Sequence, residues 1–225
     1  MALRTRPTGL YLPMRVWDVP TRLFHWLIVV IVPAAYATAK LGWTDCHLWL
    51  GYGLLALLLF RIAWGFVGSD TSRFDRFLAS PRAVLRHLAQ FGRRGPDIQI
   101  GHDAACGWMA LLLLLLLAIE VGSGLGAGAG GAEGPLARYV SGRTRDLLTV
   151  VHGMNMNLIL AAVGVHIAAI ALYAAVRRQN LVRPMITGKK RLPAATRAPR
   201  MAGTLLAAVV FVLAAAVALL LATEV

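Results

Sequence analysis

The sequence contains little charge and almost no cysteine. Of its 225 residues only 15% are charged, 10 of them acidic, whereas 58% are hydrophobic and two are cysteines. Two cysteines, Cys46 and Cys106, are too few for a disulfide framework. Soluble domains carry about 25% charged residues. The composition therefore favours a chain that is solvated by lipid over a soluble globular domain.

Long apolar runs take up most of the chain. A helix that crosses a membrane needs about 20 mostly apolar residues. Five runs come close to or exceed this length: residues 23–39, 47–67, 104–122, 147–176 and 201–223. We therefore expect five membrane-spanning helices. A shorter stretch, residues 80–91, alternates apolar residues and arginines with helical periodicity, which predicts an amphipathic helix lying on the membrane surface.

The 23 basic residues are distributed unevenly around these spans. In a five-span arrangement the N-terminal leader and the connections after the second and fourth spans share one side of the membrane. They hold 18 Lys and Arg residues, whereas the other side holds 4. Because basic residues collect in cytoplasmic loops, the sequence predicts a multi-pass membrane protein with a cytoplasmic N-terminus. The net charge of +13 then requires no nucleic-acid partner.

Four of the six histidines, His25, His47, His152 and His166, lie inside the predicted spans. Ionisable residues in a bilayer are costly and by default indicate a functional site. His152 and His166 are 14 residues apart, so they share one face of the fourth span and differ in depth by about 21 Å. His25 matches the cytoplasmic depth of His166, and His47 matches the outer depth of His152. The sequence thus predicts an inner pair, His25 with His166, and an outer pair, His47 with His152.

Two imidazoles that face each other favour haem over zinc. Zinc takes three or four nitrogen or sulfur ligands, whereas haem iron needs two axial ligands because the porphyrin supplies the other four. Two histidines leave no open position on the iron, which favours electron transfer over oxygen chemistry. Covalently attached haem is excluded, because the only C-H pair, Cys46-His47, lacks the second cysteine of a C-x-x-C-H site. A haem-free scaffold or transporter with proton-relaying histidines is the alternative.

Two arginines extend the candidate site. Arg61 follows His47 by 14 residues, which places it on the same helical face at the inner depth, and Arg22 lies one turn before His25. We predict that both pair with haem propionates through bidentate hydrogen bonds. Snorkelling to the lipid headgroups is the alternative. Glycines next to the histidines are expected to give a flat ring room to approach: Gly51, Gly53, Gly153 and Gly164.

Three further polar residues carry weaker signals. His102 begins the third span and is interpreted as a capping residue or a propionate partner. His87 lies on the amphipathic helix and is expected to be solvated. Glu120, near the outer end of the third span, is expected to reach the membrane interface, with a role in a proton path or a quinone site as the alternative.

Ordered motifs along the chain resemble one protein family. The motifs are RVWDVPTRLFHW (15–26), HLWLGY (47–52), FRIAWGFVG (60–68), GHD (101–103) and NLVRPMITG (180–188). Together they resemble the bacterial cytochrome b561 family and, within it, the branch that includes the b-type cytochrome subunits of nickel-iron hydrogenases. Asp103 and Ala104 stand where this family usually has asparagine and proline.

The resemblance implies an all-α integral membrane protein. Residues 1–200 would form a four-helix bundle that holds two b-type haems, with ligands from the first, second and fourth spans. Residues 201–225 would add a C-terminal transmembrane helix. The resemblance also implies a place in the bacterial inner membrane and electron transfer between the quinone pool and a periplasmic redox partner, for which we expect a c-type cytochrome.

Two other functions fit the same resemblance. One is a quinone-linked oxidoreductase, similar to a superoxide oxidase, that acts at the periplasmic face. The other is the b subunit of a nickel-iron hydrogenase. We expect an electron-transfer protein rather than an enzyme with its own substrate.

Overall fold

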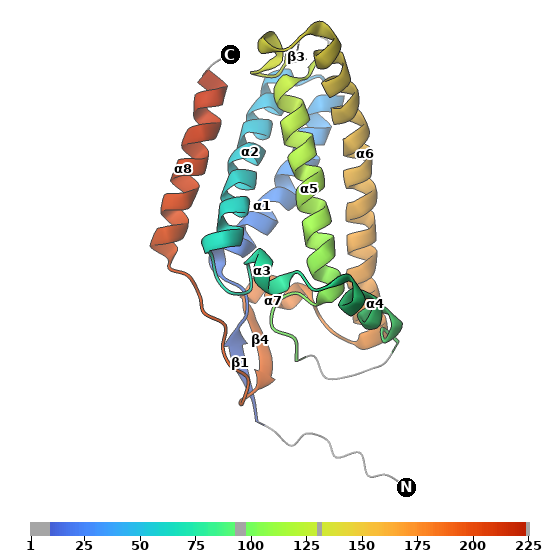
Figure 1. The fold of residues 1–225 in the computed structure, drawn as a ribbon, viewed down its shortest axis with the longest axis vertical. Coiled ribbons are helices and arrows are strands. Elements are labelled where there is room, and N and C mark those ends of the chain that lie inside the picture. Colours follow the sequence, from blue (N-terminus) through green and yellow to red (C-terminus); the bar gives the residue numbers. More distant parts are fainter. Residues whose placement is uncertain (1–9, 93–97, 130–131, 224–225) are drawn as a thin grey trace.

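Five long helices run alongside one another in the computed structural model, which describes residues 10–92, 98–129 and 132–223 (Figure 1). All five are long and apolar enough to cross a membrane. They are α1 (Val19–Lys40), α2 (Thr44–Val67), α5 (Ala104–Gly126), α6 (Gly142–Leu172, continued by the π-helical turn η2, Tyr173–Arg177) and α8 (Thr204–Thr223). The predicted spans and the all-helical fold class are confirmed.

Shorter elements lie at the two ends of this bundle (Figure 1). At one end, here called the basic end, are β1 (Tyr11–Arg15), α3 (Phe74–Phe77), α4 (Pro81–Ala89), α7 (Val182–Thr187) and β4 (Lys189–Pro193). Strands β1 and β4 pair in antiparallel register, so the N-terminal segment is tied to the segment after α7. At the other end, the hairpin end, are β2 (Gly128–Ala129), β3 (Ala132–Glu133) and the 3-10 turn η1 (Ala137–Tyr139). Helix α4 matches the predicted amphipathic helix.

Four of the helices begin at a side chain that caps them. In each, the side-chain oxygen of a Ser or Asp accepts a hydrogen bond from the backbone N–H three residues later. The capping residues are Asp18 for α1, Ser80 for α4, Asp103 for α5 and Ser141 for α6. Such caps satisfy backbone N–H groups that the helix itself leaves without a partner.

Helix α2 lies at the centre of the bundle. In its most apolar window 56% of the residues are buried, against 11% to 22% in the other four spans. Leu54 and Leu58 of α2 pack with Leu117 of α5 and Ala218 of α8. Nearer the basic end, Trp64 belongs to a second cluster that includes residues of α1 and α8. Helix α8 thus packs along α2, although the proposed domain boundary at residue 200 stays a prediction.

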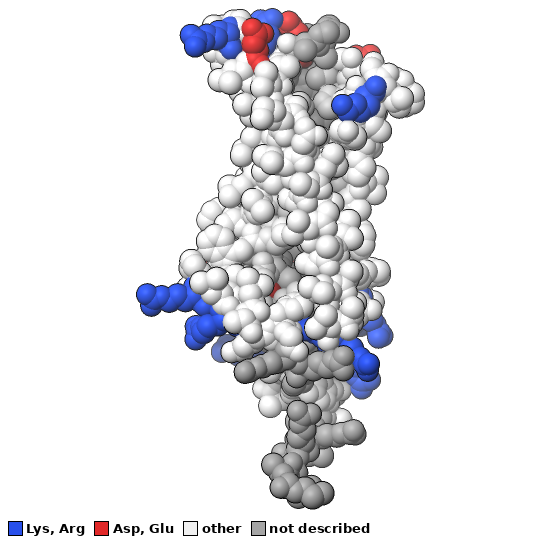
Figure 2. Space-filling model, turned by 90° about the vertical axis from the view of Figure 1, so that its right-hand side faces the viewer, with Lys and Arg blue, Asp and Glu red and all other residues white. Residues whose placement is uncertain are grey.

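Charged side chains are confined to the ends on the face drawn in Figure 2, and a broad band without Lys or Arg lies between them. Such a band is what a lipid-facing surface requires, because charge in the hydrocarbon region is costly. The five apolar helices and this uncharged band together fit a multi-pass membrane protein.

Asp18 connects three segments at the basic end. It is 4% exposed, and its carboxylate accepts hydrogen bonds from the Thr21 backbone N–H at 2.7 Å, the Trp64 indole at 3.0 Å and the Ser72 hydroxyl at 3.1 Å. Trp64 is fully buried and stacks on Phe60 with 5.7 Å between ring centroids. The carboxylate thus joins the start of α1 to the end of α2 and to the loop that follows α2.

Replacing this carboxylate should lower stability. Asp18→Ala removes the cap of α1 and leaves the Trp64 indole N–H buried without an acceptor, for which we expect a loss of about 2–4 kcal/mol. Thermal unfolding in detergent, followed by circular dichroism, should show a clearly lower midpoint. Asp45→Ala is the control, because Asp45 is exposed in the first turn of α2. Equal midpoints for the two variants would contradict this role of Asp18.

Candidate functional site

His47 of α2 and His152 of α6 face each other near the hairpin end. Their ring centroids are 6.0 Å apart and their planes are 82° to one another. The Nδ1 atom of His47 lies 2.9 Å from the carbonyl oxygen of Ala35, and that of His152 lies 2.9 Å from the carbonyl oxygen of Glu120. Because a carbonyl only accepts, each Nδ1 carries the hydrogen, which leaves the Nε2 lone pair free to bind a metal.

The spacing of this pair fits a metal held between two imidazoles. A metal–imidazole bond is about 2 Å long, so two rings on opposite sides of one ion have centroids about 6 Å apart. There is also room beside the pair. Gly51 and Gly53 of α2 are half-buried, yet a Cβ atom built on either meets no atom within 4 Å. The expectation of space for a flat ring fits these two glycines, whereas Gly153 and Gly164 lie exposed on α6.

The second predicted pair lies toward the basic end. His166 of α6 is near enough to interact electrostatically with His25 of α1 and with His102. The buried nitrogens without a hydrogen-bond partner within the described part of the chain include His25 Nδ1, Arg61 Nη1 and His102 Nδ1. Buried polar groups are normally hydrogen-bonded. Orphaned atoms on three separate elements fit a site for a polar group that the protein itself does not supply.

Arg61 is buried inside the protein at this end, with 4% of its surface exposed. Its guanidinium lies over the rings of Phe74 and Phe77, 5.3 Å and 5.9 Å from the centroids. Snorkelling to the headgroups is therefore the wrong interpretation for Arg61. Arg22 is placed differently, because its Nε donates to the Asp18 carbonyl and its Nη1 to the Ile186 carbonyl, which ties α1 to α7.

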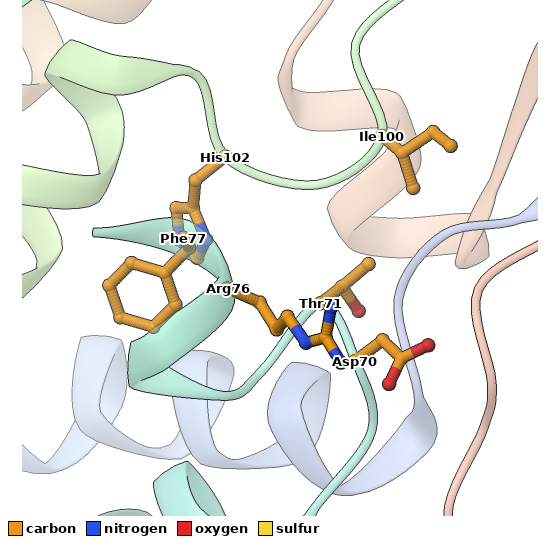
Figure 3. A pocket seen from close by; sticks show the side chains of 6 residues that line it. All are labelled: Asp70, Thr71, Arg76, Phe77, Ile100 and His102. Atoms are coloured by element: carbon orange, nitrogen blue, oxygen red, sulfur yellow. The ribbon is translucent and has the colours of Figure 1, made fainter. Parts of the chain in front are cut away.

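His102 lies between two aromatic rings and lines a cavity of about 160 Å³ (Figure 3). Its ring is 4.7 Å from that of Trp17 and 4.7 Å from that of Phe77. On the other side of the cavity, Arg76 reaches toward Thr71 and Asp70 (Figure 3). Burial, together with the charge of Arg61, holds the pKa of His102 well below its usual value. His102 is therefore neutral at physiological pH.

Glu120 does not reach the membrane interface, so that expectation is wrong. It is 8% exposed, and its Oε2 accepts a hydrogen bond from the Asn155 side chain at 2.7 Å. Its Oε1 lies 3.4 Å from Nδ1 of His152. Asn155 also donates to the Leu116 carbonyl at 2.9 Å. Hydrocarbon offers no hydrogen-bond partner, so the carboxylate is held between α5 and α6 instead.

His87 is not solvated either, and that expectation is also wrong. Its Nε2 lies 2.7 Å from the Tyr173 hydroxyl, which in turn donates to Asp103 Oδ2 at 2.6 Å. Burial alone would raise the pKa of Asp103, but hydrogen bonds from the Cys106 backbone N–H and from Tyr173 outweigh it and hold the pKa below its usual value. The charged Asp103 thus ties α4 to α5 and to the turn η2.

Two residues of this site gave only weak signals in the sequence. Asn155 stands one turn after His152, and an amide inside a span is a sign of a buried partner. Gly124 stands one turn after Glu120, where a Cβ atom would lie 3.0 Å from Cε1 of His152. A side chain at position 124 would therefore push against the imidazole. Neither contact could be found without knowing which faces of α5 and α6 meet.

A membrane helix bundle with facing, carbonyl-bonded histidines and orphaned buried nitrogens has the character of a membrane haem protein. The family model described as prokaryotic cytochrome b561 matches residues 16–188. The chain therefore belongs to the prokaryotic cytochrome b561 family. No curated protein and no solved structure matched in the same comparisons.

Family membership makes the chain a membrane b-type cytochrome that takes part in electron transfer. It also makes b-type haem its cofactor. The alternative of a haem-free scaffold or transporter is therefore wrong.

The buried, neutral His102 predicts a pH dependence of stability. Because the pKa of this group is lower in the folded chain than in the unfolded chain, the unfolded chain binds the proton more readily once the pH falls below about 6.5. Stability is then lost as the pH falls further. His102→Phe fills the same place between Trp17 and Phe77 and removes this proton. The thermal midpoint in detergent should fall less for the variant than for the wild type between pH 7.5 and 5. Equal falls would contradict the prediction.

Proposed function

We propose that the chain holds two b-type haems and carries electrons across the membrane between the quinone pool and a periplasmic redox partner such as a c-type cytochrome. The outer haem would be held by His47 and His152, and the inner haem by His25 and His166. The observation that carries this proposal is the 6.0 Å separation of the His47 and His152 rings, each with its Nδ1 on a backbone carbonyl.

Haem iron held by these histidines would supply a one-electron couple. The protein's part is to hold those imidazoles. Hydrogen bonds to the carbonyls of Ala35 and Glu120 fix the rotation and tautomer of His47 and His152. His152 and His166 lie 14 residues apart on α6, about 21 Å along its axis, so one helix contributes a ligand at each depth.

Arg61 is the proposed partner for the propionates of the inner haem. Its orphaned Nη1 is buried beside His102, and a carboxylate there would complete its hydrogen bonding. Arg22 is proposed as a second partner, although two of its nitrogens already bond to backbone carbonyls.

We infer that the basic end faces the cytoplasm and the hairpin end faces the periplasm of a bacterial inner membrane. The 18 basic residues of the leader and of the connections after α2 and α6 support this orientation. His47 stands in the first turn of α2, close to the hairpin end. The outer haem would then lie near the face at which a soluble periplasmic partner docks.

Removing ligands one at a time tests the pairing. The wild-type protein, purified from haem-replete cells, should show two haems per chain by pyridine haemochrome assay. His152→Ala and His25→Ala should each retain one. His87→Gln is the control and should retain both, because His87 belongs to the network with Tyr173. Loss of both haems or of neither in His152→Ala would contradict the assignment.

Electron transfer itself is tested in liposomes that contain quinol. In liposomes that contain the protein, we expect quinol to reduce the haem and the haem then to reduce cytochrome c added outside. Liposomes without the protein should not reduce the cytochrome c. His152→Ala should slow the reduction of cytochrome c at least tenfold while quinol still reduces the remaining haem. Oxidation of superoxide with quinone and without any protein partner would instead identify the superoxide oxidase-like alternative. Reduction of the haems only by a co-purifying hydrogenase would identify the hydrogenase subunit.

A further inference from the structure

A buried acidic residue lies beside the outer histidine pair, and a buried basic residue lies beside His102 toward the basic end. At the outer pair, Glu120 of α5 lies with Oε1 3.4 Å from Nδ1 of His152. Toward the basic end, the guanidinium of Arg61 interacts electrostatically with His102, and His102 in turn with His25 and His166. Both charged residues are almost fully enclosed, with 8% and 4% of their surfaces exposed. Charges that are shielded from water act strongly on their surroundings.

Hydrogen-bond donors lie at both oxygens of the Glu120 side chain. Oε2 accepts a hydrogen bond from the Asn155 amide at 2.7 Å. Oε1 faces the N–H of His152, whose main acceptor is the backbone carbonyl of the same glutamate. The hydrogen bond donated to Oε2 and the N–H that faces Oε1 both favour the negative charge, against the cost of burying it. The groups with which Glu120 interacts electrostatically are His152 and His47, the two members of the outer pair.

The charge of Arg61 is only partly balanced. Asp18 interacts with Arg61 electrostatically, but the Asp18 oxygens accept hydrogen bonds from Thr21, Trp64 and Ser72. Nη1 of Arg61 keeps no partner within the described residues. The Arg61 guanidinium therefore keeps a donor for an anionic group at this end of the bundle.

We propose that Glu120 is a positioning residue that sets the reduction potential at the outer histidine pair. Its carboxylate makes a haem held there the harder of the two to reduce, whereas Arg61 makes the inner one easier to reduce. The physical reason is that reduction adds one electron, which a buried anion opposes and a buried cation favours. This inference rests on the proposed pairing of the histidines. It gives α5, which supplies no ligand, a defined part in the redox chemistry.

The test is a redox titration of the purified holoprotein at fixed pH, followed by visible absorbance. The wild type should show two one-electron transitions, and His152→Ala should lack the lower one. Glu120→Gln keeps the shape of the side chain and removes its charge. It should raise the lower transition by about tenfold in the equilibrium constant, or about 59 mV for a one-electron couple, with the upper transition and the haem content unchanged.

Two variants separate charge from packing. Glu120→Asp keeps the charge and should leave the lower transition near its wild-type position. Glu133→Gln is the matched control, because Glu133 is a carboxylate at the same end that is exposed and paired with Arg145 at 2.8 Å. It should shift neither transition. A purely structural role of Glu120 would cost haem in both Glu120 variants without the charge-dependent shift.

The proposal is overturned if Glu120→Gln leaves the lower transition in place, or if the lower transition is the one lost in His25→Ala. Loss of the lower transition in His25→Ala is observed without any Glu120 variant. It therefore tests the proposal even if Glu120→Gln does not assemble. Failure of the proposed function is seen separately, in the haem count. If the chain holds a single haem and His152→Ala keeps it, both proposals are contradicted. If His152→Ala loses that single haem, only the two-haem proposal fails, and Glu120→Gln should still raise the reduction potential of the haem.

Discussion

Hydrocarbon offers a polar group no hydrogen-bond partner, and the interior of this bundle is arranged around that constraint. Asn155 donates to Glu120 and to a backbone carbonyl of α5. Asp18 accepts from three donors on three segments. Buried nitrogens of His25, Arg61 and His102, which lie near one another toward the basic end, have no hydrogen-bond partner within the described residues. The haem that we propose at this site, with its carboxylates and metal ion, would supply partners for such nitrogens.

Three helices, α2, α5 and α6, contribute different residues to the candidate site. Helix α2 is the most buried span and carries His47 at one end and Arg61 at the other. Helix α6 lies largely exposed and carries His152 and His166. Helix α5 contributes neither histidine, but its Glu120 carbonyl, its Glu120 carboxylate and the small Gly124 surround the ring of His152. The imidazole of His152, on an exposed helix, is thus held in place by the neighbouring helix α5.

The two ends of the bundle also differ in how they are closed. At the basic end, β1 pairs with β4, Arg22 joins α1 to α7, and Asp103 ties α4 and η2 to the start of α5. At the hairpin end, the described residues between α5 and α6 form two short strands and a 3-10 turn, and three residues join α1 to α2. The basic end, which we assign to the cytoplasm, therefore has more contacts between its segments. The outer histidine pair lies near the hairpin end, which has fewer.

The sequence by itself determined the five spans, the spacing of His152 and His166 along one of them, and the family. Hydrophobic runs, loop charge and a 14-residue spacing are local properties that follow from the thickness of a bilayer and the pitch of a helix. It could not determine which helix faces meet. Only the tertiary structure showed Glu120 turned inward to Asn155, His87 bonded to Tyr173, and Gly124 against His152. These contacts depend on how α4, α5 and α6 are rotated against one another, and apolar sequences such as those of α5 and α8 carry almost no periodic signal for that rotation. Polar contacts across the helices select it instead.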